Sequence, residues 1–133
     1  MKSPAHDLAL WMASEGVGTF GNTIHVSREP ISPDDVVTLY DTGGSAPLLS
    51  DHAELRDHTI QVRVRNTDYP AGYEKQQEIA RIIQGLEPFV TDDYEYTGIW
   101  MQSDIIAIGR DDNDRFLFTA NYRVVREPLE AGS

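Results

Sequence analysis

The stretch that decides the fold begins Val36-Val-Thr-Leu-Tyr-Asp-Thr-Gly-Gly-Ser-Ala-Pro47, passes through Thr59-Ile-Gln-Val-Arg-Val-Arg65 and ends in a helix near Ile83. Its first part is rich in β-branched and aromatic residues, which predicts a strand that ends in a sharp glycine-rich turn. In its second part apolar and polar residues alternate, which is typical of a strand with one buried face. The residues between them, 42–57, have no clear period and predict a long loop, and such loops are often functional.

Two helices are predicted on either side of these strands. Ser3 and Pro4 form an N-cap and a first-turn proline, and the apolar residues that follow predict a helix to about Glu15. Between Pro70 and Leu86 the isoleucines fall at helical spacing, which predicts a second, amphipathic helix. A glycine and a proline near its end stop it.

The remaining segments predict strands. Residues 23–27 form a short one after a glycine-rich break. Residues 97–109 and 115–126 form a long hairpin around the polar turn 110–114, and Ser103 with Asp104 predicts a bulge or bend in its first strand. The residues of the second strand that share a face and should be buried are Phe116, Phe118, Ala120, Tyr122 and Val124.

The predicted order is therefore α-β-β-β-α-β-β. We expect an α+β fold with a mostly antiparallel sheet of about five strands and two helices packed on one face. With 133 residues the chain predicts a single domain, spanning 1–133, with a short exposed C-terminal tail from about residue 127.

Composition excludes several classes of function. The 22 acidic and 11 basic residues give a net charge of −11, which disfavours tight binding to nucleic acid, although an acidic wall would let DNA slide past. The chain has no cysteine, so disulfides, thiolate nucleophiles and thiolate metal sites are ruled out, consistent with a reducing cytoplasm. No signal peptide and no membrane span of ~20 apolar residues is expected.

Two acidic motifs could indicate metal binding or catalysis, but both are better explained as turns. Asp111, Asp112 and Asp114 could bind a hard cation, yet this segment lacks the central glycine and distal glutamate of a calcium loop. Asp41-Thr42-Gly43 resembles the aspartic protease triplet, which needs a second carboxylate and therefore a homodimer. Phosphate loops and nucleophile elbows are absent and the histidines are scattered. We therefore expect no enzyme activity, no cofactor and no metal.

Arg63 and Arg65 share one face of a predicted strand. They could extend, with Arg123, into a basic stripe for nucleic acid. Because the chain is so acidic, we favour pairing of these arginines with carboxylates of a neighbouring subunit. Aromatic residues such as Tyr69 and Tyr73 are more often packing residues than platforms for bases.

Several short motifs together resemble the tail terminator, or minor capsid (head–tail joining), proteins of long-tailed bacteriophages. They are Leu39-Tyr-Asp-Thr-Gly-Gly44 with Pro47, Gln61-Val-Arg-Val-Arg65, Tyr73, and Gly109-Arg-Asp111 with Arg115-Phe116, and the resemblance covers roughly residues 36–125. It implies a structural virion protein, assembled in the host cytoplasm as a ring, usually hexameric, at the head-proximal end of the tail tube. Such a ring ends tube polymerisation and joins the tail to the head connector, while DNA passes through the lumen without specific binding.

A ring subunit needs two different, complementary faces. Basic Arg63 and Arg65 on one side and acidic loop residues on the other could supply them. We expect the loop 42–57 and the turn 92–94 to contact the tube protein or the connector. The residues expected at subunit or partner interfaces are Asp41, Thr42, Gly43, Gly44, Pro47, Arg63, Arg65, Tyr69, Tyr73, Asp93, Asp111 and Arg115.

Two alternatives stay open. One is another neck adaptor, such as a head- or tail-completion protein, which shares the size and the ring habit. The other is a small dimeric ligand-binding or enzymatic α+β domain. A deep apolar pocket with convergent polar groups would favour the latter.

Overall fold

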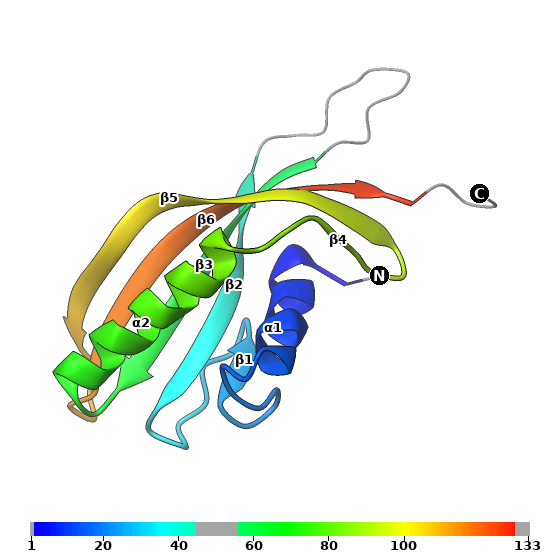
Figure 1. Ribbon diagram of the computed structural model, residues 1–133. Helices are drawn as coiled ribbons and strands as arrows, with labels where there is room; N and C mark the ends of the chain where they lie inside the picture. Colours follow the sequence, from blue (N-terminus) through cyan, green and yellow to red (C-terminus); the bar gives the residue numbers. More distant parts are fainter. Residues whose placement is uncertain (1, 45–55, 130–133) are drawn as a thin grey trace.

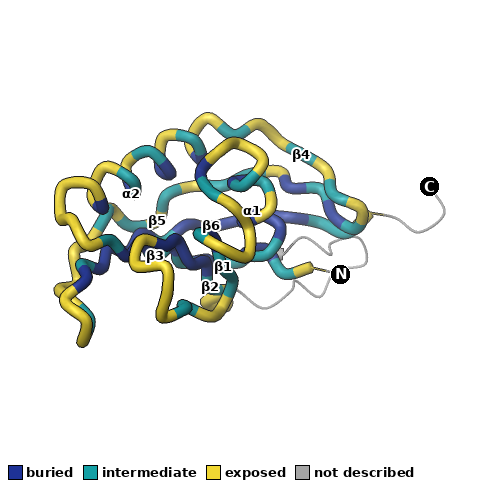
Figure 2. The backbone as a smooth tube through the Cα atoms, turned by 90° about the horizontal axis from the view of Figure 1, so that it is seen from below, coloured by how far each residue is buried: buried dark blue, intermediate teal, exposed yellow. Residues whose placement is uncertain are grey.

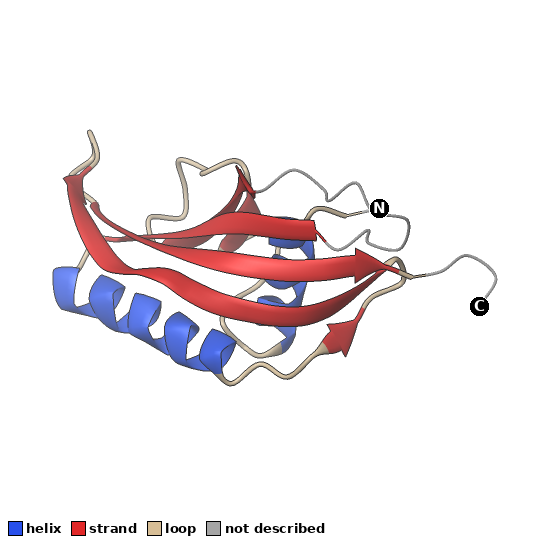
Figure 3. Ribbon diagram, turned by 90° about the horizontal axis from the view of Figure 1, so that it is seen from above, coloured by secondary structure: helices blue, strands red, loops and turns tan. Residues whose placement is uncertain are grey.

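The computed structural model describes residues 2–44 and 56–129 and has two layers, a curled sheet and a pair of helices (Figure 1). In chain order the elements are α1 (Pro4–Ser14), β1 (Ile24–Val26), β2 (Val36–Gly44), β3 (Arg56–Asn66), α2 (Tyr69–Gln84), β4 (Phe89–Val90), β5 (Tyr94–Arg110) and β6 (Phe116–Pro128). Both helices lie on the same face of the sheet, as the sequence predicts (Figure 3).

The helix boundaries follow the capping signals in the sequence. The Ser3 hydroxyl accepts a hydrogen bond from the His6 N–H at 3.2 Å, which confirms the predicted N-cap of α1. Asp68 plays the same part for α2, where its carboxylate accepts from the Ala71 N–H at 2.9 Å. Gly85 forms the C-cap of α2, where the sequence places the end of that helix.

The sheet has six strands in the order β1-β2-β3-β6-β5-β4. The prediction of about five strands missed β4, because two residues after a proline are too short to carry an alternating pattern. The sheet is also mixed, where the sequence predicted a mostly antiparallel one: β1 runs parallel to β2, and the other strand pairs are antiparallel. The connection 27–35 returns the chain to the end of the sheet from which β1 started, and this makes the pair parallel.

The sharp turn predicted at Asp41 is wrong. β2 continues to Gly44, and a bulge between Asp41 and Gly43 shifts its register against β3. Gly43 has a φ of +102°, a conformation that favours glycine, so the glycines serve the bulge of a continuing strand. Most of the predicted loop, including Pro47, lies in residues 45–55, outside the described part of the chain.

The core lies between the helices and the sheet. Ile60, Val62 and Val64 of β3 point into it, as their alternation predicts, and so do Phe118, Ala120, Tyr122 and Val124 of β6. Helix α1 contributes Ala5, Leu8, Ala9 and Met12 to the same core. Figure 2 shows that buried positions follow β2, β3 and β6, whereas the outer turns of α2 are exposed.

The long strands give the subunit two distinct ends. At the first, which we call the loop end, β2 stops at Gly44, β3 starts at Arg56, and β5 starts at Tyr94 opposite Pro128 of β6. At the second, which we call the hairpin end, the turn 111–115 joins β5 to β6 beside the start of α2. The predicted bulge in β5 is confirmed by register shifts on both sides of Ser103.

Candidate subunit interfaces

The two arginines predicted to pair between subunits find partners within their own chain. Segment 27–35, which we call the strap, lies against the outer face of β3, the face away from the helices. Arg63 Nε lies 3.1 Å from Glu29 of the strap, and Arg65 contacts the same carboxylate at 3.4 Å. Arg65 also donates to the carbonyl oxygens of Pro33 at 2.7 Å and Asp34 at 2.9 Å.

This arrangement corrects the expectation for Arg65. Its side chain is only 2% exposed, so it presents no surface to a neighbour. Its planar guanidinium is suited to several carbonyl groups at once, which is the role it has here. Arg63 keeps a partly exposed side chain on the outer face and stays a predicted contact.

Arg115 and Asp111 also act inside the subunit. Arg115 is buried and donates through Nε to Asp111 at 2.9 Å and through Nη1 to the carbonyl of Ile31 in the strap. Burial raises the pKa of Asp111, but hydrogen bonds from the Arg115 N–H, its guanidinium and the Asn113 N–H outweigh it and hold that pKa below its usual value. These residues fix the hairpin turn and the strap together.

The geometry of this turn does not favour the hypothesis that its aspartates bind a cation. Asp111 accepts hydrogen bonds on both oxygens, and Asp114 pairs with Arg110 at 2.7 Å. Within residues 2–44 and 56–129, no three acidic or histidine side chains gather in a way that could hold a metal ion.

Tyr69 and Tyr73, one helical turn apart on α2, lie at the hairpin end beside the turn that holds Asp111 and Arg115. Both rings pack edge-on against Phe118, with centroids 5.0 and 6.1 Å away, and both are partly exposed. The structure thus brings four of the predicted interface residues to one end of the subunit.

The residues of the Asp41–Gly44 segment lie at the loop end instead. Asp41 accepts a hydrogen bond from the Ala5 N–H at 3.0 Å and so anchors the start of α1. The Thr42 hydroxyl lies 2.8 Å from that of Thr59 across the β2–β3 pair. Asp93 is at the same end, in the turn between β4 and β5, where its carbonyl accepts from the Leu129 N–H. The described residues of the predicted site therefore fall into two separate regions at the two ends, with Arg63 between them on the outer face of β3.

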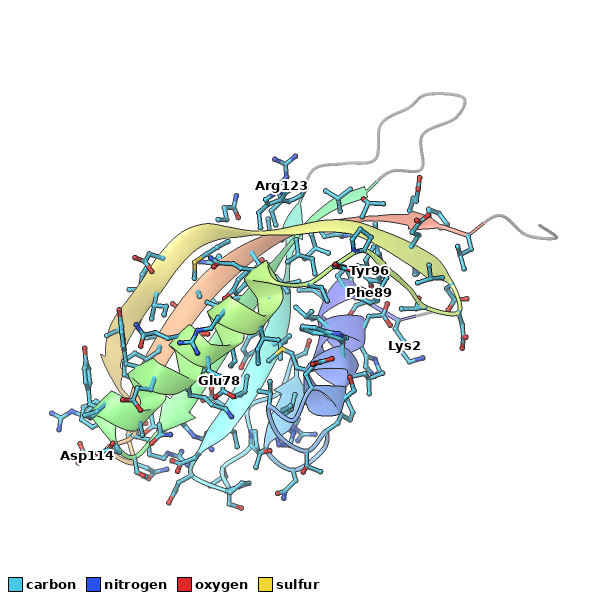
Figure 4. The ribbon with its side chains drawn as sticks, viewed as in Figure 1. Lys2, Glu78, Phe89, Tyr96, Asp114 and Arg123 are labelled. Carbon is cyan, nitrogen blue, oxygen red and sulfur yellow. The ribbon has the colours of Figure 1, made fainter. Side chains whose placement is uncertain are left out.

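The structure shows a polar row on the outer face that the sequence analysis did not single out. Asn121 accepts from Gln61 at 3.5 Å and donates to Ser103 at 3.0 Å, across three neighbouring strands. Next to this row Arg123 lies over the exposed Trp100 ring, 5.8 Å from its centroid, on the side of the sheet away from the helices (Figure 4). The sequence alone does not show this row, because only the register of β3, β6 and β5 brings its residues side by side.

A hollow of about 240 Å³ opens between β2, the end of β3 and α2, with Val17, Val64 and Lys75 in its lining. Lys75 donates to the Val17 carbonyl at 2.6 Å and pairs with Glu78, and Arg65 is held by the strap. The cations at this hollow are therefore bonded to the chain itself, and its geometry does not favour the ligand-binding alternative.

Neither described helix is long and apolar enough to cross a membrane.

Comparison with solved structures shows that this fold occurs in the virion of a gene transfer agent. A chain from the virion of a native gene transfer agent particle matches with a TM-score of 0.62 at 14% sequence identity, over 80% of each chain. At that identity the likeness concerns the fold alone. No curated protein matches the sequence.

A family model described as bacteriophage tail terminator protein matches residues 11–128, which include every strand, the whole of α2 and the last turn of α1. The matched range contains all the residues predicted at interfaces. The chain therefore belongs to the bacteriophage tail terminator family and is a structural component of the virion tail.

Proposed function

We propose that this protein forms a closed ring, most simply a hexamer, on the head-proximal end of the tail tube. The ring ends addition of tube protein and offers its other side to the head connector, and DNA passes through its lumen. The observation that carries this proposal is the family match over residues 11–128. The ring and its partners rest on the resemblance set out above.

The arrangement of the loop end supports contacts with the tube or the connector. Gly44, at the end of β2, and the turn at Asp93 lie at the same end of the sheet, although 48 residues separate them in sequence. A ring subunit whose strands run from one end to the other would present both segments to one partner. We therefore propose that the loop end, with Asp41–Gly44, Pro47 and Asp93, forms the axial contact.

Acidic residues at the loop end indicate what the partner surface should carry. Glu95 of β5 stands directly opposite Glu127 of β6, with Asp93 close by in the chain. Like charges in a cross-strand pair destabilise a sheet, and a basic partner surface would relieve that cost. The tube or connector protein should therefore present lysine or arginine side chains here.

Negative-stain electron microscopy tests the function directly. The purified protein is mixed with the tail-tube protein encoded nearest to it, and we expect rings and tubes capped at limited length. Uncapped tubes beside free monomer would contradict a terminator. Binding to heads before tails would favour the alternative of a neck adaptor.

A matched pair of variants tests the axial contact. Asp93→Arg reverses a charge at the loop end and should abolish capping, whereas Glu87→Arg makes the same change at an exposed position between α2 and β4 and should leave it intact. Equal capping by both variants would remove Asp93 from the contact.

A further inference from the structure

One side of the subunit carries an apolar patch around the open edge of β5. The patch consists of Tyr69 and Tyr73 of α2 with Ile106 and Ile108 of β5, which are 46, 37, 49 and 47% exposed. Both tyrosine rings contact Phe118, which stands opposite Ala107 on the helix side of the sheet. Ile106 and Ile108 flank Ala107 and therefore point to the outer face, so the tyrosines and the isoleucines lie on either side of the same open strand edge. We call these four residues the β5-side patch.

The backbone beside this patch is also open. β4 pairs with β5 only at Glu95 and Tyr96, so within the described residues no strand covers the outer edge of β5 from Thr97 to Arg110. This edge has no lysine and no proline, the residues that usually protect an edge strand; its bulges and Asp104 are the protection it has. An exposed strand edge with two half-exposed isoleucines is a surface for association.

A second apolar patch lies at the opposite edge of the sheet, beside β1. Phe20 is 40% exposed and forms an isolated bridge with Ile24 of β1, and its ring stacks on His6 with centroids 5.5 Å apart. Leu10, 37% exposed, is one helical turn from His6 on α1. We call Leu10, Phe20 and His6 the β1-side patch. Figure 1 shows α1 and β1 on one side of the molecule and the hairpin end of β5 and α2 on the other.

We propose that the β5-side patch of one subunit packs against the β1-side patch of the next, and that this contact is the seam of the ring. The two patches differ and lie on opposite sides of one subunit, which is the arrangement that head-to-tail association into a closed ring requires. This inference rests on the proposed ring and adds to it the surfaces that close it.

Charge supports a second copy as the occupant. Residues 104–114, around the β5-side patch, hold four aspartates and one arginine. Residues 2–33, which build the β1-side patch, hold Lys2 and Arg28 against three acids, of which Asp7 is buried and Glu29 is paired with Arg63. In a chain with a net charge of −11, the β1 side is therefore close to neutral, and the acidic β5 side meets little repulsion there.

Cross-linking tests the seam, because the natural chain has no cysteine to interfere. The double variant Leu10→Cys with Ile108→Cys is treated with a short bismaleimide in the presence of the tail-tube protein. We expect a ladder of covalent oligomers that ends at the ring size, and monomer from each single variant. Dimers from Ile108→Cys alone would show two-fold pairing of like patches and overturn the seam.

Charged variants test the same surface without cross-linking. Ile108→Lys should raise the concentration needed for capping by about tenfold or more, since it places an amine in an apolar contact. Ile31→Lys is the control, because that side chain is 81% exposed on the strap, outside both patches. Thermal unfolding confirms that both variants fold.

The outcomes separate the seam from the function. If the wild-type protein caps tubes while the double-cysteine variant gives no ladder, or Ile108→Lys caps as well as Ile31→Lys, the seam is wrong and the terminator function stands. If the wild-type protein forms no rings and caps no tubes, the proposed function fails and the seam fails with it.

Discussion

Two buried tyrosines differ in whether their hydroxyl groups are hydrogen-bonded. The Tyr96 hydroxyl donates to the buried Asp7 carboxylate and accepts from Arg126 at 3.1 Å, and Arg126 in turn donates to the Lys2 carbonyl at 2.7 Å (Figure 4). This network fastens α1 to β5 and β6. The Tyr122 hydroxyl is equally enclosed, yet it has no hydrogen-bond partner among the described residues.

The replacement of each tyrosine by phenylalanine should therefore change the free energy of unfolding in opposite directions. Tyr96→Phe removes the hydrogen bond to the buried Asp7 carboxylate and one acceptor of Arg126, and should cost about 2 kcal/mol. Tyr122→Phe removes an unsatisfied group and should be neutral or stabilise by up to ~1 kcal/mol. Urea unfolding at pH 7 measures both. A larger loss for Tyr122→Phe than for Tyr96→Phe would contradict this account.

The Tyr122→Phe variant should also differ from the wild-type protein in how its stability changes at high pH. Burial raises the pKa of Tyr122 to about 12, above its ordinary value of 10.0. Between these two values Tyr122 loses its proton in the unfolded chain and keeps it in the folded chain. The free energy of unfolding is therefore not reduced by this group below pH 10, and it falls as the pH rises from 10 towards 12. Tyr122→Phe should lose less stability than the wild-type protein over that interval.

At the scale of elements, the strap depends on Arg65. Arg65→Gln removes the donors to three strap carbonyls and the ion pair with Glu29, and should lower the free energy of unfolding by about 3 kcal/mol. Trypsin should then cleave faster after Arg28 in the strap. Arg123→Gln, which changes an exposed arginine on the same outer face, is the matched control and should have little effect on either measurement.

Most elements could be predicted from the sequence because their signals are local. The caps at Ser3 and Gly85 and the alternation from Ile60 to Val64 depend on neighbouring residues only. The continuation of β2 past Asp41 could not be found this way, because a glycine pair signals a turn as well as a bulge. The parallel β1–β2 pair depends on the path of the strap, which Arg65 of β3 and Arg115 of the hairpin turn hold in place from distant parts of the sequence.

At the scale of the whole molecule, the interface is harder to predict than the fold. The sequence pointed to Tyr69 and Tyr73, yet it gave no reason to join them to Ile106 and Ile108, since only the β5–β6 register brings these four residues to one edge. The sequence predicts that Arg63 and Arg65 pair with a neighbouring subunit, because nothing in it shows that the strap of the same chain reaches them. A charge pattern alone does not say whether a partner residue is in the same chain.

The response of assembly to salt distinguishes the two kinds of interface. Each subunit carries a net charge of −11, so bringing subunits together opposes like charges, and salt screens that repulsion. If the apolar seam closes the ring, the yield of cross-linked rings from the Leu10→Cys, Ile108→Cys variant without tube protein should rise from about 50 mM to about 300 mM NaCl, a measurement that the acid–base axial contact does not enter. Arginine–carboxylate pairs between subunits would weaken over the same range and give the opposite trend. Asp104→Asn, which removes one exposed charge beside Ile106, should flatten the rise, because less repulsion is left for the salt to screen.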